Sequence, residues 1–341
     1  MITFSQRAES LHTTQASARF NDLLLIVNPG SRAGGRLLPE VLSALGSARV
    51  RTVQTEAPRH ATAIVREALA TGSTTFDAVL VLGGDGTAME VATALAEFPD
   101  APPLGIIALG TANVLARTLG IPMNPSRAID ALREADTVMI DLGLIEGGPA
   151  FAIGLGIGLD ATMIARVSTR LKRRIGYLAY GFSALGAGLR LDRFAATITV
   201  DGTVHRVSTS SVLVANFGTV LGDLLCFGDG IAHQDGVLDV CVYSPQTHVH
   251  AVRILWRMLR GGLHRDDNVQ VFRGRHIRIE TDRPRPMQAD GELIGETPVT
   301  VRVLPSAVRM LVPRVSPRRW RVPRLPQARF AAPLSKIGSW T

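Results

Sequence analysis

Short apolar runs alternate with amphipathic stretches over the first 140 residues of the chain. The apolar runs, which end in glycine-containing loops as buried strands do before a turn, cover residues 23–27, 78–82 and 104–109. The stretches that predict helices cover residues 36–45, 60–70, 88–96 and 112–119. Because strands that alternate with helices are typical of a parallel sheet covered by helices, residues 21–139 are predicted to form an α/β domain with a Rossmann-like parallel sheet.

From about residue 140 the pattern changes to shorter β-rich segments separated by turn residues. Asp201-Gly202 joins two of them, residues 195–200 and 204–207, in the manner of a two-residue hairpin. Further strands are predicted at residues 211–215, 238–243, 269–272, 277–280, 299–303 and 308–312, and helices at residues 175–189 and 248–259. Many short strands with turns between them predict a mostly antiparallel β-sandwich over residues 140–313. Residues 1–20 then form a flexible extension and residues 314–341 a tail.

The net charge of +8 is concentrated in the predicted tail. The tail has no acidic residue and carries Arg314, Arg318, Arg319, Arg321, Arg324, Arg329 and Lys336. The chain has 37 basic and 29 acidic residues, so the rest of the chain, with 37 − 7 = 30 basic residues, is nearly neutral. This distribution argues against a nucleic-acid partner. The tail also contains Trp320, Phe330 and Trp340, and basic residues interleaved with aromatic ones suit an anionic membrane surface. The alternative is a disordered tail without a partner.

Several features favour a cytoplasmic protein that is associated with the membrane only at its surface. At 46% hydrophobic, 341 residues can bury a large core, but no run reaches the roughly 20 apolar residues that a spanning helix needs. The predicted helix at residues 175–189 is glycine-rich and bounded by arginines, so a buried helix is preferred to an interfacial one. Cys226 and Cys241 have neither metal-ligand nor disulfide-framework spacing, and the N-terminus lacks the apolar core of a secretory signal.

The sharpest motif, Gly83-Gly84-Asp85-Gly86-Thr87, lies between a predicted strand and a predicted helix. Glycines let the backbone approach a phosphate closely, and the N-terminus of the helix adds N–H groups and a positive dipole end. Asp85 can bind Mg²⁺ directly or through water. Because a plain strand-to-helix turn needs only one glycine, the motif predicts a phosphate site.

Two further loops, residues 28–35 and 110–113, follow other strands of the same predicted sheet. Ligands bind at the carboxyl ends of the strands in an open α/β sheet, so the three loops are expected to face one nucleotide. The chain has no Walker A motif and only two lysines, Lys172 and Lys336, so it is not a P-loop enzyme. Arg117 is a candidate for the positive charge near the phosphates, or else a solvated residue on a helix face.

These motifs, together with Asp235-Gly236-Val237-Leu238-Asp239 and Asp290-Gly291-Glu292, resemble the diacylglycerol kinase catalytic family. That family includes bacterial lipid kinases and is similar to sphingosine and ceramide kinases. The resemblance runs from about residue 23 to residue 312, and five landmarks in order are specific, whereas the GGDGT loop alone also occurs in NAD kinases and phosphofructokinases. It implies a phosphotransferase that moves the γ-phosphate of ATP to a lipid hydroxyl with Mg²⁺, with diacylglycerol as the first candidate acceptor and phosphatidic acid as its product.

The resemblance also implies roles for individual residues. The expected ATP contacts are Asn28, Thr55, Gly83, Gly84, Asp85, Gly86, Thr87, Thr111 and Asn113. Glu292 is implied as the proton acceptor for the lipid hydroxyl and Asp85 as a neighbour of the phosphates or the metal, although either acid can serve as the base. Asp235 is implied to form a structural Mg²⁺ or Ca²⁺ site with the main-chain carbonyls of Ala232 and Val237. On the residue pattern alone, Asp290-Gly291 predicts an ordinary hairpin turn.

Two positions depart from the family pattern. Met89 and Val114 stand where the family usually has Asn and Asp, so each replaces a polar group with an apolar one near the expected nucleotide. They leave open a catalytically silent protein that binds a lipid or a nucleotide. Kinases that act on NAD, a sugar phosphate or a sphingoid base form a second set of candidates, in which the absence of an Asn-Glu pair after Gly110 disfavours NAD. The sequence predicts no oligomeric state.

Overall fold

The computed structural model describes residues 20–31, 34–70, 76–158, 192–221 and 224–314. The predicted N-terminal extension, the predicted helix at residues 175–189 and the tail beyond Arg314 lie outside these ranges. In the described part of the chain, no helix is both long enough and apolar enough to cross a membrane.

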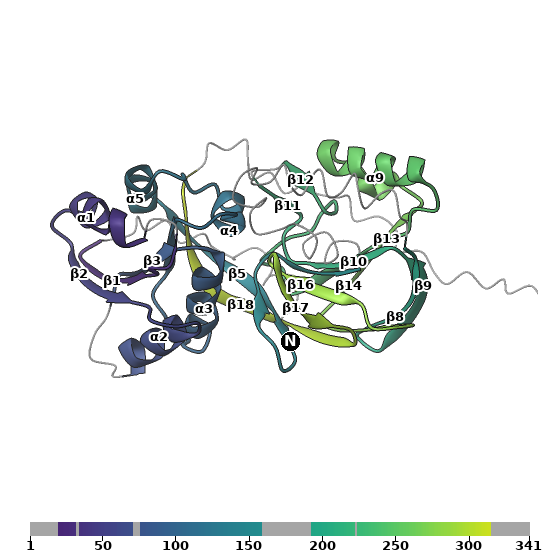
Figure 1. The fold of residues 1–341 in the computed structure, drawn as a ribbon, viewed down its shortest axis with the longest axis horizontal. Helices are drawn as coiled ribbons and strands as arrows, with labels where there is room; N and C mark the ends of the chain where they lie inside the picture. The colour runs from purple at the N-terminus through teal and green to yellow at the C-terminus, as the bar shows by residue number, and fades with distance from the viewer. Residues whose placement is uncertain (1–19, 32–33, 71–75, 159–191, 222–223, 315–341) are drawn as a thin grey trace, which may run out of the picture.

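The N-terminal domain is built on four parallel strands in the order β2-β1-β3-β4. These strands are β1 (Asp22–Val27), β2 (Arg49–Gln54), β3 (Ala78–Gly83) and β4 (Leu104–Ala108). The helices are α1 (Gly34–Leu45), α2 (His60–Ala70), α3 (Asp85–Leu95), α4 (Val114–Thr118) and α5 (Pro125–Arg133). Helix α1 packs beside α5 on one face of the sheet, and α2 beside α3 on the other (Figure 1). The predicted α/β domain with a Rossmann-like sheet is confirmed.

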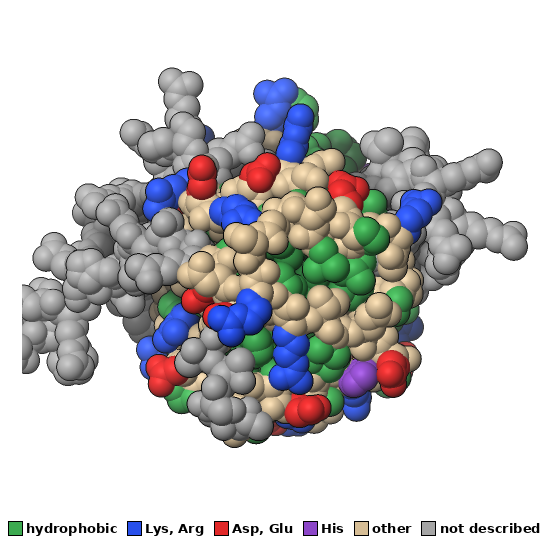
Figure 2. Space-filling view, turned by 90° about the vertical axis from the view of Figure 1, so that its left-hand side faces the viewer, with side chains coloured by type: hydrophobic (Ala, Val, Ile, Leu, Met, Phe, Trp, Pro, Cys, Tyr) green, Lys and Arg blue, Asp and Glu red, His purple; other side chains and the backbone are tan. Residues whose placement is uncertain are grey.

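Burial explains which strands form the centre of this sheet. Strands β3 and β4 are buried along their whole length, and β1 is buried beyond its first residue. Their sequences are near-continuous apolar runs because helices cover both faces of the sheet. Strand β2, with the sequence RVRTVQ, forms the edge and exposes Arg49 and Arg51. Charged side chains on an edge strand hinder pairing with another chain. Figure 2 views the molecule from this end and shows acidic and basic side chains interspersed over it.

The C-terminal domain is a β-sandwich. One of its sheets has the order β14-β13-β10-β7-β16-β17, and every pairing in it is antiparallel. Its strands are β7 (Gly154–Gly158), β10 (Ser211–Ala215), β13 (Leu238–Tyr243), β14 (Val269–Gly274), β16 (Pro286–Ala289) and β17 (Glu292–Glu296). The other layer consists of β8 (Phe194–Val200), β9 (Thr203–Thr209), β15 (His276–Thr281) and part of β18 (Val299–Val312), joined by antiparallel pairing. The predicted mostly antiparallel sandwich is confirmed.

Shorter elements complete this domain, and the predicted hairpin is present. Asp201 and Gly202 connect β8 to β9, both with positive φ (46° and 84°), as a two-residue turn of this kind requires. The remaining elements are β6 (Ala150–Phe151), β11 (Thr219–Val220), β12 (Leu225–Cys226), helix α9 (His248–Arg260) and a 3₁₀ turn (Leu263–Arg265).

The two domains share their longest strands. Strand β18 pairs along its length with β5 (Asp136–Ile145), and Met310 of β18 also pairs in parallel with Leu104 of β4. Val299, Val301 and Val303 lie in the sandwich core, whereas residues 308 and 310–312 lie in the core of the α/β domain. The end of the predicted C-terminal domain, residues 308–312, therefore packs into the core of the α/β domain. The strands predicted at 299–303 and 308–312 are two halves of one strand with an irregularity between them.

Candidate active site

A cavity of about 500 Å³ lies where the loops after β1, β3 and β4 meet the turn that begins β17. Its lining consists of Asn28, Gly30, Ser31, Gly84, Gly86, Thr87, Gly110, Thr111 and Glu292. The first eight come from the carboxyl ends of the parallel strands, and Glu292 comes from the sandwich. The predicted convergence of three loops is confirmed, and the second domain closes the cavity with a carboxylate.

Glycines allow the three loops to touch one another. A Cβ atom on Gly110 would lie 2.8 Å from the Cα of Gly84, and one on Gly83 would lie 3.3 Å from the Cβ of Asn28. Side chains at these positions would push the loops apart, because such contacts are closer than van der Waals packing allows. The glycines of the GGDGT motif therefore serve the approach of neighbouring backbone as well as that of a phosphate.

Asn28 connects the first loop to the second. Its Nδ2 donates a hydrogen bond to Oγ1 of Thr87 (2.9 Å), and its Oδ1 accepts one from the N–H of Gly30 (2.9 Å). The hydroxyl of Ser31 donates to the carbonyl oxygen of Asn28 (2.7 Å). Helix α3 begins at Asp85, and Gly84 before it makes no side-chain capping hydrogen bond. The N–H groups of the first turn have no partner within the helix, so they can bind an anion in the cavity.

Asp85 lies behind the cavity lining and joins the second loop to the third. Its carboxylate accepts hydrogen bonds from the N–H groups of Val114 (3.0 Å) and Leu115 (3.1 Å), at the start of α4. Burial raises the pKa of Asp85 above its usual range, while the N–H donors and the charge of Arg117 oppose that rise. The structure thus gives Asp85 a positioning role, and its contact with Mg²⁺ or phosphate stays a prediction.

Four other residues expected near the nucleotide, Gly83, Asn113, Thr55 and Arg117, also lie outside the cavity lining. Asn113 is buried, adopts a positive φ of 50° and donates from Nδ2 to the carbonyl of Gly110 (3.0 Å). Thr55 follows β2 and donates its N–H to the carbonyl of Val27 (2.8 Å), directly before Asn28. Arg117 donates from Nε to the carbonyl of Ala112 (3.2 Å). Asn113 and Arg117 shape the third loop, and direct contacts of Asn113 and Thr55 with ATP stay predictions.

Glu292 approaches the phosphate loop across the domain boundary. A Cβ atom on Gly86 would lie 3.2 Å from Oε1 of Glu292, which is tighter than ordinary contact. Glycine at position 86 therefore allows the carboxylate to rest against the first turn of α3. This places an acidic oxygen next to the N–H groups that are suited to bind phosphate.

Asp290 fixes the turn that carries Glu292. Its carboxylate accepts hydrogen bonds from the N–H groups of Ala152 (2.7 Å), Ile153 (2.9 Å) and Gly154 (3.0 Å). Burial raises the pKa of Asp290 to about 6, and the nearby charge of Asp85 adds to the rise while the N–H donors oppose it. Asp290 and Gly291 do form a turn, with φ values of 46° and 90°, but the sequence pattern could not reveal the distant partners of the carboxylate.

The segment predicted to hold a structural metal is braced by protein groups. Asp235 accepts a hydrogen bond from the N–H of Val237 (3.3 Å), and its Oδ2 lies 3.7 Å from Nη2 of Arg273. The fully buried Asp141 accepts from the N–H groups of Gly236 (2.7 Å) and Ser306 (2.6 Å). No group of three or more His, Cys, Asp or Glu side chains in the described ranges is arranged to bind a metal ion. Metal binding by Asp235 with the carbonyls of Ala232 and Val237 stays a prediction.

The two departures from the expected pattern have structural explanations. Met89 is 9% exposed and belongs to the core of the α/β domain, so it lies away from the cavity lining. Val114 begins α4, and it is its backbone N–H, not its side chain, that bonds to Asp85. Neither apolar side chain narrows the cavity.

The fold and the cavity define a class: two-domain proteins in which the glycine loops of an α/β domain form a cavity that a β-sandwich completes. Residues 22–145 match the family model described as the diacylglycerol kinase catalytic domain. Residues 154–312 match the model described as the YegS C-terminal NAD kinase beta sandwich-like domain. The chain belongs to the diacylglycerol kinase family and has the two-domain organisation of its YegS-like lipid kinases.

Known proteins agree with this assignment. A probable lipid kinase YegS-like from Pseudomonas fluorescens is 30% identical over 74% of this chain and 82% of that protein. An uncharacterized protein of Synechocystis is also 30% identical, over 69% of this chain but only 54% of that protein. The crystal structure of a putative diacylglycerol kinase from Bacillus anthracis superposes with a TM-score of 0.70 at 26% identity, covering 87% of this chain and 98% of that one.

Proposed function

We propose that the protein transfers the γ-phosphate of ATP to the hydroxyl of a membrane lipid, with diacylglycerol as the first candidate acceptor. The observation that carries the proposal is the position of Glu292, which reaches from the sandwich to Gly86 of the phosphate loop. One cavity thus contains N–H groups that are suited to bind phosphate and, next to them, a carboxylate. The matching catalytic domain and the similar B. anthracis protein are both named after diacylglycerol, which supports this lipid as the first to test.

The residues of the cavity divide the work of phosphoryl transfer between them. The loops that contain Gly84, Gly110 and Gly30 hold the phosphates through backbone N–H groups, and the bond from Asn28 to Thr87 keeps two of these loops together. Glu292 accepts the proton of the lipid hydroxyl as that oxygen attacks the γ-phosphorus. Positioning contributes more than the base in phosphoryl transfer, so the glycine contacts between loops matter as much as the carboxylate.

The cavity fits a divalent cation that arrives with the nucleotide. Its polar lining includes the Glu292 carboxylate and the side-chain oxygens of Asn28 and Thr87, and oxygen is the ligand that Mg²⁺ prefers. Mg²⁺ usually uses only one or two protein carboxylates together with the phosphates of the substrate. When bound, it would neutralise charge that develops on the transferred phosphoryl group. Asn28 and Thr87 are the lining residues that would contact it, which leaves the Glu292 carboxylate to the lipid hydroxyl.

The lipid acceptor is tested by incubating the protein with γ-labelled ATP, Mg²⁺ and mixed micelles of one lipid at a time. The panel contains diacylglycerol, monoacylglycerol, phosphatidylglycerol, sphingosine and ceramide, with free NAD as a soluble acceptor. We expect label in diacylglycerol that is lost in the Glu292→Gln variant. If only NAD becomes labelled, the acceptor is a soluble molecule and the proposed lipid acceptor is wrong. ATP binding without transfer to any acceptor would support the silent binding protein and overturn the proposal.

A further inference from the structure

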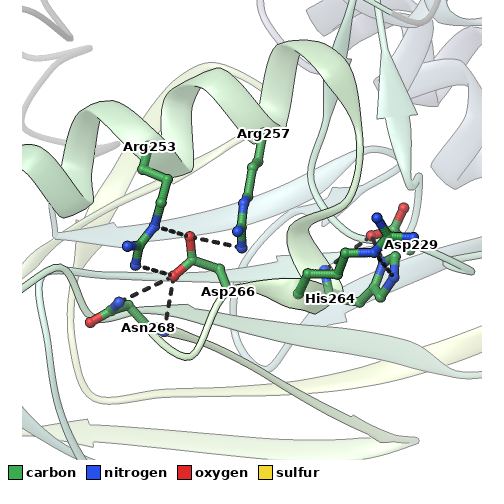
Figure 3. A network of polar contacts seen from close by, with 7 residues as sticks. Asp229, Arg253, Arg257, His264, Asp266 and Asn268 are labelled. Carbon is green, nitrogen blue, oxygen red and sulfur yellow. Dashed lines mark hydrogen bonds and ion pairs between the residues drawn. The ribbon is translucent and has the colours of Figure 1, made fainter.

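Helix α9 is held to the sandwich by its charged side. Arg253 donates from Nε and Nη2 to the two carboxylate oxygens of Asp266 (both 2.9 Å), and Nη1 of Arg257 lies 3.1 Å from the same carboxylate. The side chain of Asp266 has no exposed surface. Figure 3 shows both arginines pointing from the helix toward Asp266 beneath it, with Asn268 completing the cluster. The side of α9 that faces the body of the protein therefore combines these two arginines with Ile254 and Met258, which pack in a core cluster.

The opposite side of the helix is apolar and exposed. Val249 is 72% exposed, Val252 65%, Trp256 56% and Leu259 46%. Their spacing of three, four and three residues places all four on one face, which we call the outer stripe of α9. A surface helix normally turns its apolar stripe toward the core and its charges toward water. In α9 the inner side carries the buried Ile254 together with the two arginines that bind Asp266, while four apolar side chains face outward.

The exposed apolar side chains of α9 favour a partner. Arg253 and Arg257 are paired with Asp266, whereas the guanidinium of the exposed Arg260 lies 4.5 Å from the centre of the Trp256 ring. Residues 248–260 contain no acidic residue. Tryptophan and arginine beside aliphatic side chains are typical of helices that lie at the interface of an anionic bilayer. Arg260, beside Trp256, adds electrostatic attraction to such a surface.

A second copy of the chain fits the outer stripe less well. Two-fold packing of one outer stripe on another would bring Arg260, which lies beside Trp256, close to its own copy, and like charges repel. Four side chains also provide much less than the ~800 Å² per partner that a stable interface buries. An anionic lipid surface satisfies both the charge and the limited apolar area.

We propose that the outer stripe of α9 is a membrane-docking surface, which inserts Val249, Val252, Trp256 and Leu259 among the headgroups of an anionic bilayer. This inference rests on the proposed function, since a lipid kinase must reach an acceptor that is embedded in a membrane. Binding to vesicles needs neither ATP nor transfer, so the docking surface is measured independently of the reaction. The predicted contact through the basic tail involves other residues and is separable from it.

The test uses the full chain with Trp320→Phe and Trp340→Phe, which leaves Trp256 as the single tryptophan. Its emission is recorded with vesicles of phosphatidylcholine and with vesicles that also contain phosphatidylglycerol. We expect a blue shift with the anionic vesicles, quenching by lipids brominated on their acyl chains, and about tenfold weaker binding for Val252→Asp. The matched control is Val204→Asp, which changes an exposed valine on β9 and should bind as the parent does.

Each contrary result would overturn the docking surface. One is an unchanged emission maximum with anionic vesicles; another is equal binding by the Val252→Asp and Val204→Asp variants. A dimer in sedimentation that Val252→Asp dissociates would identify a second copy as the occupant. Transfer to a short-chain, water-soluble diacylglycerol separates the two claims: Val252→Asp should retain it while losing transfer to vesicle-embedded lipid. If the parent transfers phosphate neither to the short-chain diacylglycerol nor to the vesicle-embedded lipid, the proposed function fails. The measured binding to vesicles still stands in that case.

Discussion

Gly86 matters at the residue scale because a single added methyl group there would meet Glu292. The Cβ of Gly86→Ala would lie 3.2 Å from Oε1 of Glu292, so the carboxylate has to move. We expect about tenfold slower transfer, because small misplacements of a reacting group are costly. Folding stability should not fall, because alanine is favoured over glycine in a helix. The control is Gly35→Ala in α1, where a Cβ meets nothing within 4 Å. Unchanged transfer by Gly86→Ala would remove Glu292 from the site.

Asp85 supports a second prediction at this scale. Replacing it with alanine removes the acceptor for the N–H groups of Val114 and Leu115, which should lower the free energy of unfolding by about 1–2 kcal/mol. Chemical denaturation measures this change, and transfer should fall with it as the third loop loosens. If transfer disappears while stability stays the same, Asp85 acts on the phosphates or the metal instead.

The site could be predicted from the sequence only in part. The glycines around Asp85 indicated a phosphate loop by themselves, and Glu292 was assigned through the resemblance to a family. For Asp290 the sequence predicted only a turn, because the N–H groups that it binds are 136 to 138 residues away. Asp141 was given no role, because its two partners are 95 and 165 residues away. A hydrogen bond over such a separation leaves no pattern in a local window of sequence.

At the scale of elements, many strands and helices were predicted, but β2, α5, the half-buried strand β5 and the buried strand β7 were missed. The apolar strands β1, β3 and β4 start and end within one residue of their predicted limits. Strand β2 was missed because it is a sheet edge that exposes charged residues, and α5 was missed although Pro125 and its cap Asn124 mark its start. Helix α9 was predicted, but only the tertiary contacts of Asp266 reveal which face it buries.

The cluster of Asp266 with Arg253 and Arg257 predicts how α9 responds to acid. The Arg253 guanidinium beside it holds the pKa of the Asp266 carboxyl below its ordinary value of 3.8. A carboxyl with a lower pKa in the folded chain stabilises the fold above the unfolded pKa, and this stabilisation is lost as pH falls through the folded pKa. Asp266→Asn should therefore cost about 2–3 kcal/mol at pH 7, and the difference from the parent should shrink below pH 3.8.

Urea unfolding at several pH values measures this difference. Asp267→Asn is the matched control, because Asp267 is the exposed neighbour and surface substitutions usually change stability by less than about 0.5 kcal/mol. A pH-independent difference between the parent and Asp266→Asn would contradict the role given to this ion-pair cluster.

At the scale of the whole molecule, β5 and β18 make the two domains depend on each other. Each strand contributes side chains to both cores, and Met310 pairs with β4 of the α/β domain. We therefore expect one cooperative unfolding transition in calorimetry, with equal calorimetric and van't Hoff enthalpies. Pulsed hydrogen exchange should show peptides from both domains losing protection together, and Met310→Ala should lower the midpoint of this one transition. Two separate transitions would show that the shared strands do not couple the domains.

The same connection holds Glu292 of the sandwich against the phosphate loop of the α/β domain, and this is the central claim of the account. It is tested most directly by measuring kcat and the Kd for ATP in the parent, in Glu292→Gln and in Glu296→Gln, which changes an exposed residue of the same strand. Loss of the base predicts a fall in kcat of about 100-fold or more for Glu292→Gln, with little change in ATP affinity and a normal kcat for Glu296→Gln. A Glu292→Gln variant that transfers phosphate as fast as the parent would contradict the account.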